Sequence, residues 1–171
     1  MELTSPRRIT AIELGEMADT VPPFVFAVGV YGRYAPAEHA PFFDAVQAID
    51  VDQHVLPEGC RSVLTYRMGS GQDLPDLASV DALLIDSFSP DEYGGTGKQI
   101  DVEAARRLIH ETSLPVIVAG GLTPDNVGAV VRALRPFAVD VSSGVEEEPG
   151  IKSADLIAAF VAAVREADDS E

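Results

Sequence analysis

Small and hydroxyl-bearing residues follow a short apolar run at residues 137–141. Ser142, Ser143 and Gly144 come directly after this run, which has the composition of a buried parallel strand. Small side chains let several backbone N–H groups approach an anion closely, and the start of a helix nearby would add its dipole. The segment therefore predicts a phosphate site at the end of a strand. An ordinary turn between a strand and a helix is the alternative interpretation.

Two further apolar runs end in residues that could serve a site. Asp86 ends the run at residues 80–86, and Gly120 and Gly121 follow the run at residues 115–119. A carboxyl at the end of an apolar strand can have its pKa raised by desolvation, so that it keeps a proton near neutral pH. The alternative for Asp86 is a carboxylate that caps a loop or holds a backbone turn.

A glycine-rich loop follows Asp86 within residues 87–100. Gly94, Gly95 and Gly97 permit positive φ and a close approach of the backbone to a ligand, and Lys98 could offset the charge of a phosphate or carboxylate. The loop lacks the first glycine and the spacing of a nucleotide-binding P-loop. We expect it to cover the site as a lid, and an ordinary surface loop is the alternative.

Hydrophobic spacing and turn residues predict strands that alternate with helices. Thr10, Asp101 and Pro124 are expected to begin three of the helices. The predicted helices cover residues 9–20, 35–48, 101–112, 123–134 and 153–167. The predicted strands cover residues 24–30, 49–55, 62–67, 80–86, 115–119 and 137–141.

This alternation predicts an α/β fold with a parallel sheet and right-handed crossovers. Ligand-type residues follow three successive strands, and a closed barrel gathers such strand ends into one ring with phosphate on its last two loops. A TIM (β/α)8-type barrel is therefore favoured, and a doubly wound sheet is the alternative. The whole chain, 1–171, is expected to form one domain that ends in a short acidic tail.

Composition narrows the classes of function. The 171 residues are 46% hydrophobic and carry a net charge of −16, so the bulk of the surface repels nucleic acid and anionic membrane. No apolar run reaches the roughly 18 residues of a membrane span, and the first residues lack the apolar centre of a signal peptide. We predict a cytoplasmic protein that binds neither nucleic acid nor membrane. The composition leaves the oligomeric state open.

Several segments together resemble one family. They are LLIDS, GGTGKQID, AGGLTPDNV and RPFAVDVSSGVEEEPGIK, preceded by SPRRIT and PPFVFAVGVY. In this order and at these separations they resemble N-(5'-phosphoribosyl)anthranilate isomerase, a (β/α)8-barrel enzyme of tryptophan biosynthesis. The resemblance implies an Amadori rearrangement of phosphoribosylanthranilate to an aminoketose. It implies no cofactor and no metal.

The resemblance also assigns roles to individual residues. Asp86 resembles the general acid, and Arg7 resembles the residue that pairs with the anthranilate carboxylate, with Arg8 as the competing candidate. His54 resembles the histidine that ends the family's fourth strand. Gly95, Gly97 and Lys98 of the glycine-rich loop are further candidate substrate contacts, and Asp140 could contact substrate or anchor a loop. The phosphate-binding residues that it implies are Gly120, Gly121, Ser142, Ser143 and Gly144.

One departure from the family pattern concerns the general base. The family begins with a strand that carries a catalytic cysteine, then a helix and a second strand, and no residue of this sequence matches that cysteine. Cys60, the single cysteine, falls between the fourth and fifth barrel strands and is expected to be a structural residue. We therefore expect a chain with about six of eight strands, which as written is a poor catalyst with unpaired strand edges. A non-catalytic or truncated phosphate-binding relative, or another phosphate-binding barrel enzyme, is the alternative.

Overall fold

The computed structural model describes residues 8–32, 41–49, 60–71, 73, 74, 76–78, 80–87 and 100–170. Two compact units make up the chain. The first consists of Met1–Tyr66 with Pro75–Ala82, and the second of Arg67–Leu74 with Leu83–Glu171. Within the described ranges no helix is long and apolar enough to span a membrane.

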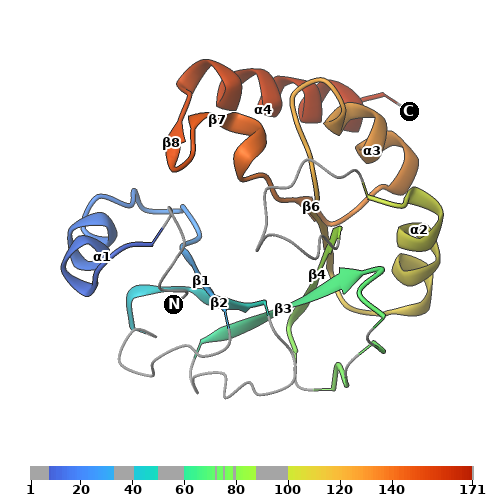
Figure 1. The fold of residues 1–171 in the computed structure, drawn as a ribbon, viewed down its shortest axis with the longest axis horizontal. Helices are drawn as coiled ribbons and strands as arrows, with labels where there is room; N and C mark the ends of the chain where they lie inside the picture. Colours follow the sequence, from blue (N-terminus) through green and yellow to red (C-terminus); the bar gives the residue numbers. More distant parts are fainter. Residues whose placement is uncertain are drawn as a thin grey trace. The chain divides into compact units, whose positions relative to one another are not determined.

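In its described residues the first unit contains three parallel strands and one helix, which are labelled in Figure 1. β1 (Val28–Tyr31) lies beside β2 (Ala45–Ala48), and β2 lies beside β3 (Arg61–Met68), which the sequence placed at 62–67. Helix α1 (Ala11–Ala18) begins after Thr10, as predicted. The Thr10 hydroxyl accepts the Glu13 N–H at 3.3 Å, and the Thr10 N–H donates to the Glu13 carboxylate at 2.7 Å. These reciprocal bonds form a capping box that explains where the helix starts.

Two predictions for the first unit were wrong. Residues 45–48, expected to end a helix, form β2, and all four are buried. A fully buried strand lacks the alternation of a half-buried one, so Phe42, Phe43 and Val46 matched helical spacing by coincidence. The predicted helix residues 35–40 and strand residues 50–55 lie outside the described part of the chain. β1 begins at Val28 rather than at Phe24, because Phe24 has φ +73°, which an extended strand does not allow.

Aromatic packing fills the core of the first unit. Tyr31 and Val46 are buried, and the ring of Phe43 meets that of Tyr31 edge-on at a centroid distance of 6.2 Å. Gly29 makes room for Phe43, since a Cβ at this glycine would lie 2.5 Å from a ring carbon. Cys60 packs against the same cluster and lies just before the first residue of β3. This placement agrees with the structural role expected for Cys60.

Asp81 ties the start of β3 to the residue before β4. Its carboxylate accepts the Ser62 N–H at 2.8 Å and the Ser62 hydroxyl at 3.0 Å, and its own N–H donates to the Ser62 carbonyl at 3.0 Å. The hydrogen bond from the Ser62 backbone has the largest effect and the one from the Ser62 hydroxyl the next largest. Both hold the pKa of the Asp81 carboxyl below its usual value. The pair therefore stabilises the fold most when Asp81 is ionised.

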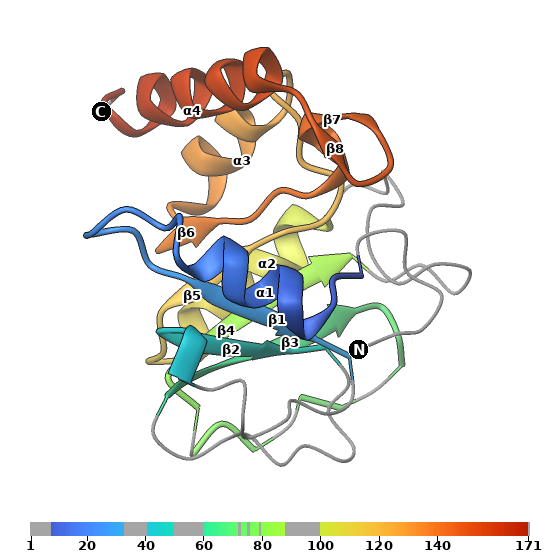
Figure 2. The ribbon, with the colours of Figure 1, turned by 90° about the vertical axis from the view of Figure 1, so that its left-hand side faces the viewer.

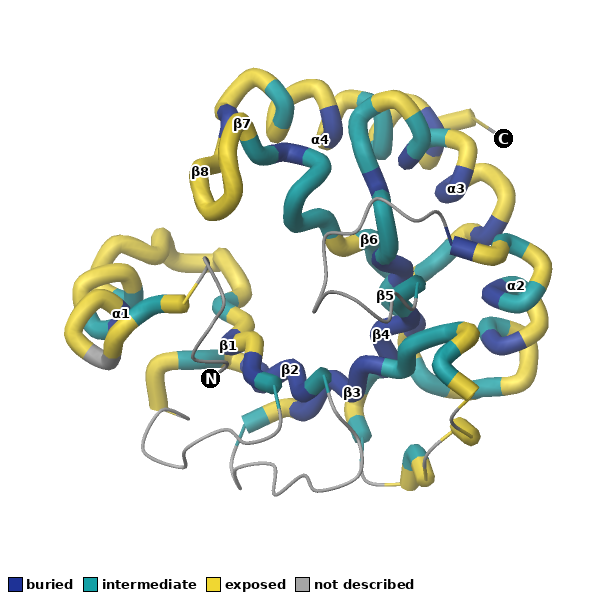
Figure 3. The backbone as a smooth tube through the Cα atoms, viewed as in Figure 1, coloured by how far each residue is buried: buried dark blue, intermediate teal, exposed yellow. Residues whose placement is uncertain are grey.

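The second unit contains β4 (Ala82–Ser87), β5 (Val116–Val118) and β6 (Ala138–Val139), which pair in parallel in that order. Helices α2 (Val102–Glu111), α3 (Val127–Leu134) and α4 (Ala154–Asp168) lie outside these strands (Figures 1 and 2). Leu83, Ile85, Val118 and Val127 have no exposed surface, and Figure 3 shows the buried residues of β4 and β5 as one continuous block. This packed layer holds the ends of the strands in place.

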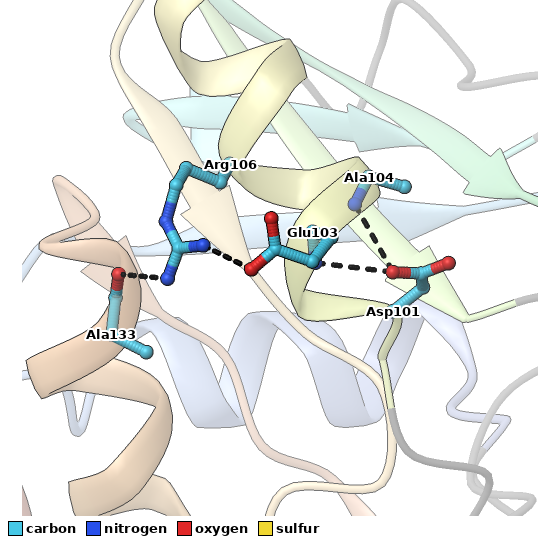
Figure 4. Close-up of polar contacts among 5 residues, drawn as sticks. All are labelled: Asp101, Glu103, Ala104, Arg106 and Ala133. Carbon is cyan, nitrogen blue, oxygen red and sulfur yellow. Dashed lines mark hydrogen bonds and ion pairs between the residues drawn. The ribbon is translucent and has the colours of Figure 1, made fainter.

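Helix α2 begins as the sequence predicts. The Asp101 carboxylate accepts the N–H groups of Glu103 and Ala104, both at 3.1 Å (Figure 4). Arg106 forms an ion pair with Glu103 and donates to the Ala133 carbonyl of α3 at 3.1 Å. One side chain of α2 thus links its own first turn to the neighbouring helix.

Three details of the second unit differ from the sequence-based expectation. Helix α3 begins at Val127 rather than at 123, and Pro124 lies in the preceding turn, because the Asn126 side chain accepts the Thr123 N–H at 2.8 Å. β6 covers two residues rather than five. A 3-10 turn, η3 (Ser143–Val145), and a hairpin of β7 (Glu146–Glu148) and β8 (Ile151–Lys152) occupy the segment before α4. Neither the 3-10 turn nor the hairpin was predicted. A run of three glutamates lacks the residue types that are typical of a strand.

We expect Asp81→Ala to lower the free energy of unfolding at pH 7 by about 1 kcal/mol, the usual contribution of such a bond at an accessible site. Because the folded pKa of Asp81 is lowered, this stabilisation is present above the unfolded pKa and disappears as pH falls through the folded pKa. Urea unfolding of both chains from pH 7 to pH 3 measures the difference. Asp73→Ala, at an exposed position, is the control, and a difference for Asp81→Ala that does not shrink in acid would contradict the prediction.

Candidate functional site

The candidate site lies at the carboxyl ends of β4, β5 and β6 in the second unit. These strands are parallel neighbours, so their ends meet at one edge of the sheet. The Ala119 N–H donates to the Ile85 carbonyl at 2.8 Å, and the Asp140 N–H donates to the Val118 carbonyl at 2.9 Å. Asp86, Gly120–Gly121 and Ser142–Gly144 therefore follow three adjoining strand ends, as predicted.

Gly120 brings the end of β5 against the carboxyl of Asp86. Its φ is +95°, and a Cβ built on it would lie 2.7 Å from the N and Oγ atoms of Ser87 and 3.0 Å from Oδ1 of Asp86. No other residue type fits both this conformation and this space. The glycine thus allows the backbone after β5 to enclose the carboxyl.

The Asn126 side chain braces the turn that follows Gly120. Asn126 accepts the Thr123 N–H at 2.8 Å and donates from Nδ2 to the Gly121 carbonyl at 2.9 Å. Both groups are partly buried, and Gly121 has φ +60°. The two bonds hold the backbone from Gly121 to Thr123 in one conformation ahead of α3.

The turn after β6 packs directly on the turn after β5. A Cβ on Gly144 would lie 1.8 Å from the Leu122 carbonyl oxygen and 3.2 Å from the Thr123 Cα. Gly144 is in the short 3-10 turn η3, which starts at Ser143. The glycine and serine turns therefore form one continuous surface of backbone groups and small side chains.

The electrostatics of Asp86 suit a proton donor. Burial raises the pKa of this carboxyl; a hydrogen bond from the Ser87 backbone opposes the rise, the charge of Asp140 adds to it, and the charge of Arg67 opposes it. The net direction is upward, because desolvation is the largest of these effects. A group of this kind holds its proton at a higher pH than an exposed aspartate.

The pKa of the Asp140 carboxyl is also raised. Burial raises the pKa of Asp140, and the charge of Lys152 lowers it. The residue nevertheless keeps a solvent-exposed surface, and screening by water limits the rise. The charge of Asp140 adds to the rise that burial causes in the pKa of Asp86.

Several predicted residues cannot be placed. Arg7, His54, Gly95, Gly97 and Lys98 lie outside the described residues. Arg8 is described and exposed, but it belongs to the first unit. The site therefore consists of Asp86, Asp140 and the residues of the two turns. Among the residues that the structure describes, no cluster of three or more His, Cys, Asp or Glu side chains could hold a metal ion.

Three further side chains contribute to the site, and sequence reasoning missed all of them. Asn126 braces the first turn, Arg67 acts on the charge of Asp86, and Lys152 donates to the Ser142 carbonyl at 2.8 Å. Asn126 three residues after Thr123 is a recognisable local capping signal. The hairpin that returns Lys152 to Ser142 gave no comparable signal, since it depends on pairing between β7 and β8.

Taken together, the parallel strands, the enclosed acid and the two adjoining small-residue turns define an α/β protein of the TIM-barrel type. Comparisons with known proteins agree. Residues 51–163 match the family model described as N-(5'phosphoribosyl)anthranilate (PRA) isomerase. The N-(5'-phosphoribosyl)anthranilate isomerase of Nitrosococcus oceani is 40% identical over 172 residues, which cover 94% of this chain and 82% of the relative.

Solved structures of the same enzyme share the fold. The phosphoribosyl anthranilate isomerase of Thermus thermophilus superposes with a TM-score of 0.76 at 30% identity, covering 96% of this chain and 84% of that one. Another phosphoribosyl anthranilate isomerase was solved with reduced 1-(o-carboxyphenylamino)-1-deoxyribulose 5-phosphate bound. It superposes with a TM-score of 0.71 at 25% identity, covering 95% of this chain and 83% of that one. The chain belongs to the N-(5'-phosphoribosyl)anthranilate isomerase family.

Gly120→Ala tests the close approach of the two strand ends. We expect this variant to lose about 1 to 3 kcal/mol of stability, because alanine is strained at positive φ and its methyl group would overlap Ser87. Gly15→Ala, in α1 with open space around it, is the control and should be neutral or stabilising. Urea unfolding measures both, and equal stability of the two variants would show that Gly120 is not constrained in this way.

Proposed function

We propose that this chain is an isomerase of tryptophan biosynthesis that converts N-(5'-phosphoribosyl)anthranilate to 1-(o-carboxyphenylamino)-1-deoxyribulose 5-phosphate, with Asp86 as the general acid. Membership of the family supports the reaction. The observation that carries the role of Asp86 is its enclosure between Ser87 and Gly120 at a strand end, with a pKa raised by burial. An acid that holds its proton near neutral pH is what the first step requires.

The reaction is an internal redox isomerisation, so no outside electron donor takes part. Asp86 gives its proton to the furanose ring oxygen while the C1′–O bond breaks, and the nitrogen lone pair forms the iminium. A base then removes the C2′ proton, and the C2′–H electron pair forms an enolamine that becomes the ketone. Asp86 is left as a carboxylate, and Arg67 and the Ser87 N–H stabilise its charge.

The base that removes the C2′ proton is a separate group. In the family a cysteine has this role. Cys60 lies just before β3, at the amino end of that strand, and packs against Tyr31 and Val46. We therefore do not assign the base to Cys60, because ligands of such folds bind at the carboxyl ends of strands.

The two turns are proposed to hold the substrate phosphate. Gly120 and Gly121 end one strand, and Ser142 to Gly144 follow the next, so their backbone N–H groups supply donors without adding charge. The reduced product analogue bound to one relative carries a phosphate. Arg7 remains the proposed partner of the anthranilate carboxylate. His54, Gly95, Gly97, Lys98 and Asp140 remain proposed substrate contacts.

The remaining proposals follow from the same assignment. The chain is proposed to act as one catalytic domain in the cytoplasm, where its phosphorylated substrate is confined because a charged phosphate crosses lipid poorly. Its small-molecule site is proposed to bind phosphoribosylanthranilate and no nucleic acid, which agrees with the net charge of −16.

Asp86→Asn should lower kcat of the full-length gene product by at least about 100-fold while substrate binding is kept, since the amide cannot donate the same proton. A carboxyl with a raised folded pKa weakens the fold once ionised, so the variant should be at least as stable as the parent at pH 7. Steady-state kinetics and urea unfolding measure the two effects. Asp168→Asn, exposed near the end of α4, is the control. Near-normal turnover would remove Asp86 from the mechanism.

Gly121→Asp tests the phosphate assignment, with Gly121→Asn as a neutral control of the same shape. Both side chains tolerate the left-handed conformation at φ +60°, so they differ mainly in charge. We expect the aspartate to weaken binding of the reduced product analogue by about 2 kcal/mol or more relative to asparagine, because it sets like charges together. Calorimetric titration measures the affinity of each variant for the analogue. Equal affinities in the two variants would place the phosphate elsewhere.

A further inference from the structure

One lysine joins both ends of the segment that follows β6. Lys152, in β8, donates from Nζ to the Ser142 carbonyl at 2.8 Å and to Oε1 of Glu146 at 2.8 Å. Ser142 precedes η3 and Glu146 follows it. The ammonium group therefore closes the short turn Ser143–Val145 from the side of the β7–β8 hairpin, which connects this turn to α4 along the chain (Figure 1).

The contact with Glu146 makes this arrangement hard to change. The Glu146 side chain is only 4% exposed, whereas that of Lys152 is 42% exposed. A buried carboxylate that lost this cation would lose a charged partner where water cannot replace it. Lys152 is therefore held on Glu146, and the position of its ammonium group relative to Ser142 is fixed.

The contacts of the Ser142 carbonyl set the direction of the next N–H group, and besides the Lys152 ammonium this carbonyl accepts the Val145 N–H at 3.4 Å. No peptide bond of the described residues is cis, so the carbonyl of Ser142 and the N–H of Ser143 point to opposite sides of one rigid plane. A carbonyl held toward Lys152 therefore turns the Ser143 N–H away from Lys152. The following residue, Gly144, is fixed on the other side by the Leu122 carbonyl.

From these contacts we infer that Lys152 is a positioning residue for the phosphate site, which acts through the Ser142–Ser143 peptide. The inference rests on the proposed function, because the turn that it orients is the proposed phosphate turn. Lys152 uses two of its hydrogens on Ser142 and Glu146 and presents the peptide donors to the ligand. Its charge also acts on Asp140, where it opposes the rise in pKa that burial causes.

The test compares Lys152→Met with the double variant Lys152→Met/Glu146→Leu, using the full-length gene product. Ligands are reduced 1-(o-carboxyphenylamino)-1-deoxyribulose 5-phosphate and its dephosphorylated form, titrated by calorimetry. We expect Lys152→Met to lower affinity for the phosphorylated ligand by about 10-fold or more while affinity for the dephosphorylated form changes less than about 2-fold. The double variant should regain stability, because no charge stays buried, but should not regain phosphate affinity.

Two controls separate positioning from charge and from folding. Arg165→Met removes an equal charge from an exposed site on α4 and should leave both affinities unchanged. Lys152→Arg, which can still donate to the Ser142 carbonyl, should recover most of the phosphate affinity. Wild-type affinity in the double variant, or an equal loss for both ligands in Lys152→Met, would overturn the inference. Failure of the parent protein itself to bind the phosphorylated ligand would instead overturn the proposed function.

Discussion

The site depends on the close contact of glycine backbones with neighbouring strand ends. Gly120 lies against Asp86 and Ser87, and Gly144 lies against Leu122, at distances that exclude any Cβ. Because the contacts are made by main chain, they are rigid, and they leave peptide N–H groups rather than side chains at the surface of the site. The buried strands β4 and β5 beneath supply the flat support that such packing needs.

The same packing explains why the pKa of Asp86 is raised. Enclosure removes water from the carboxyl, which favours the neutral acid, and the charge of Asp140 acts in the same direction. Arg67 and the Ser87 N–H oppose this shift, so they would stabilise the carboxylate that the proposed proton transfer leaves behind. An acid must release its proton as well as hold it, and the opposing groups supply the second requirement.

Sequence reasoning succeeded where the cause of a structure is local. Thr10 and Asp101 cap their helices as predicted, because the bonds involved span three residues. Asp86 and the two small-residue turns were located because parallel strands end abruptly in polar residues. Failures occurred where distant contacts decide. Burial of all four residues of β2 overrode helical spacing, and pairing of β7 with β8 brought Lys152 to Ser142.

The proposed phosphate site has to attract its ligand against the field of a chain with a net charge of −16. Diffuse positive charge cannot solve this problem here, so the solution has to be short-ranged. Peptide N–H groups lose little strength through long-range repulsion, and a low-charge turn keeps acidic side chains away from the ligand. Lys152 fits this arrangement because Glu146 already balances its charge, so it contributes orientation of the turn rather than a free cation. Affinity of the proposed site for phosphate then depends on the geometry of the two turns. Acidic surface residues elsewhere on the chain can be replaced without effect on that geometry.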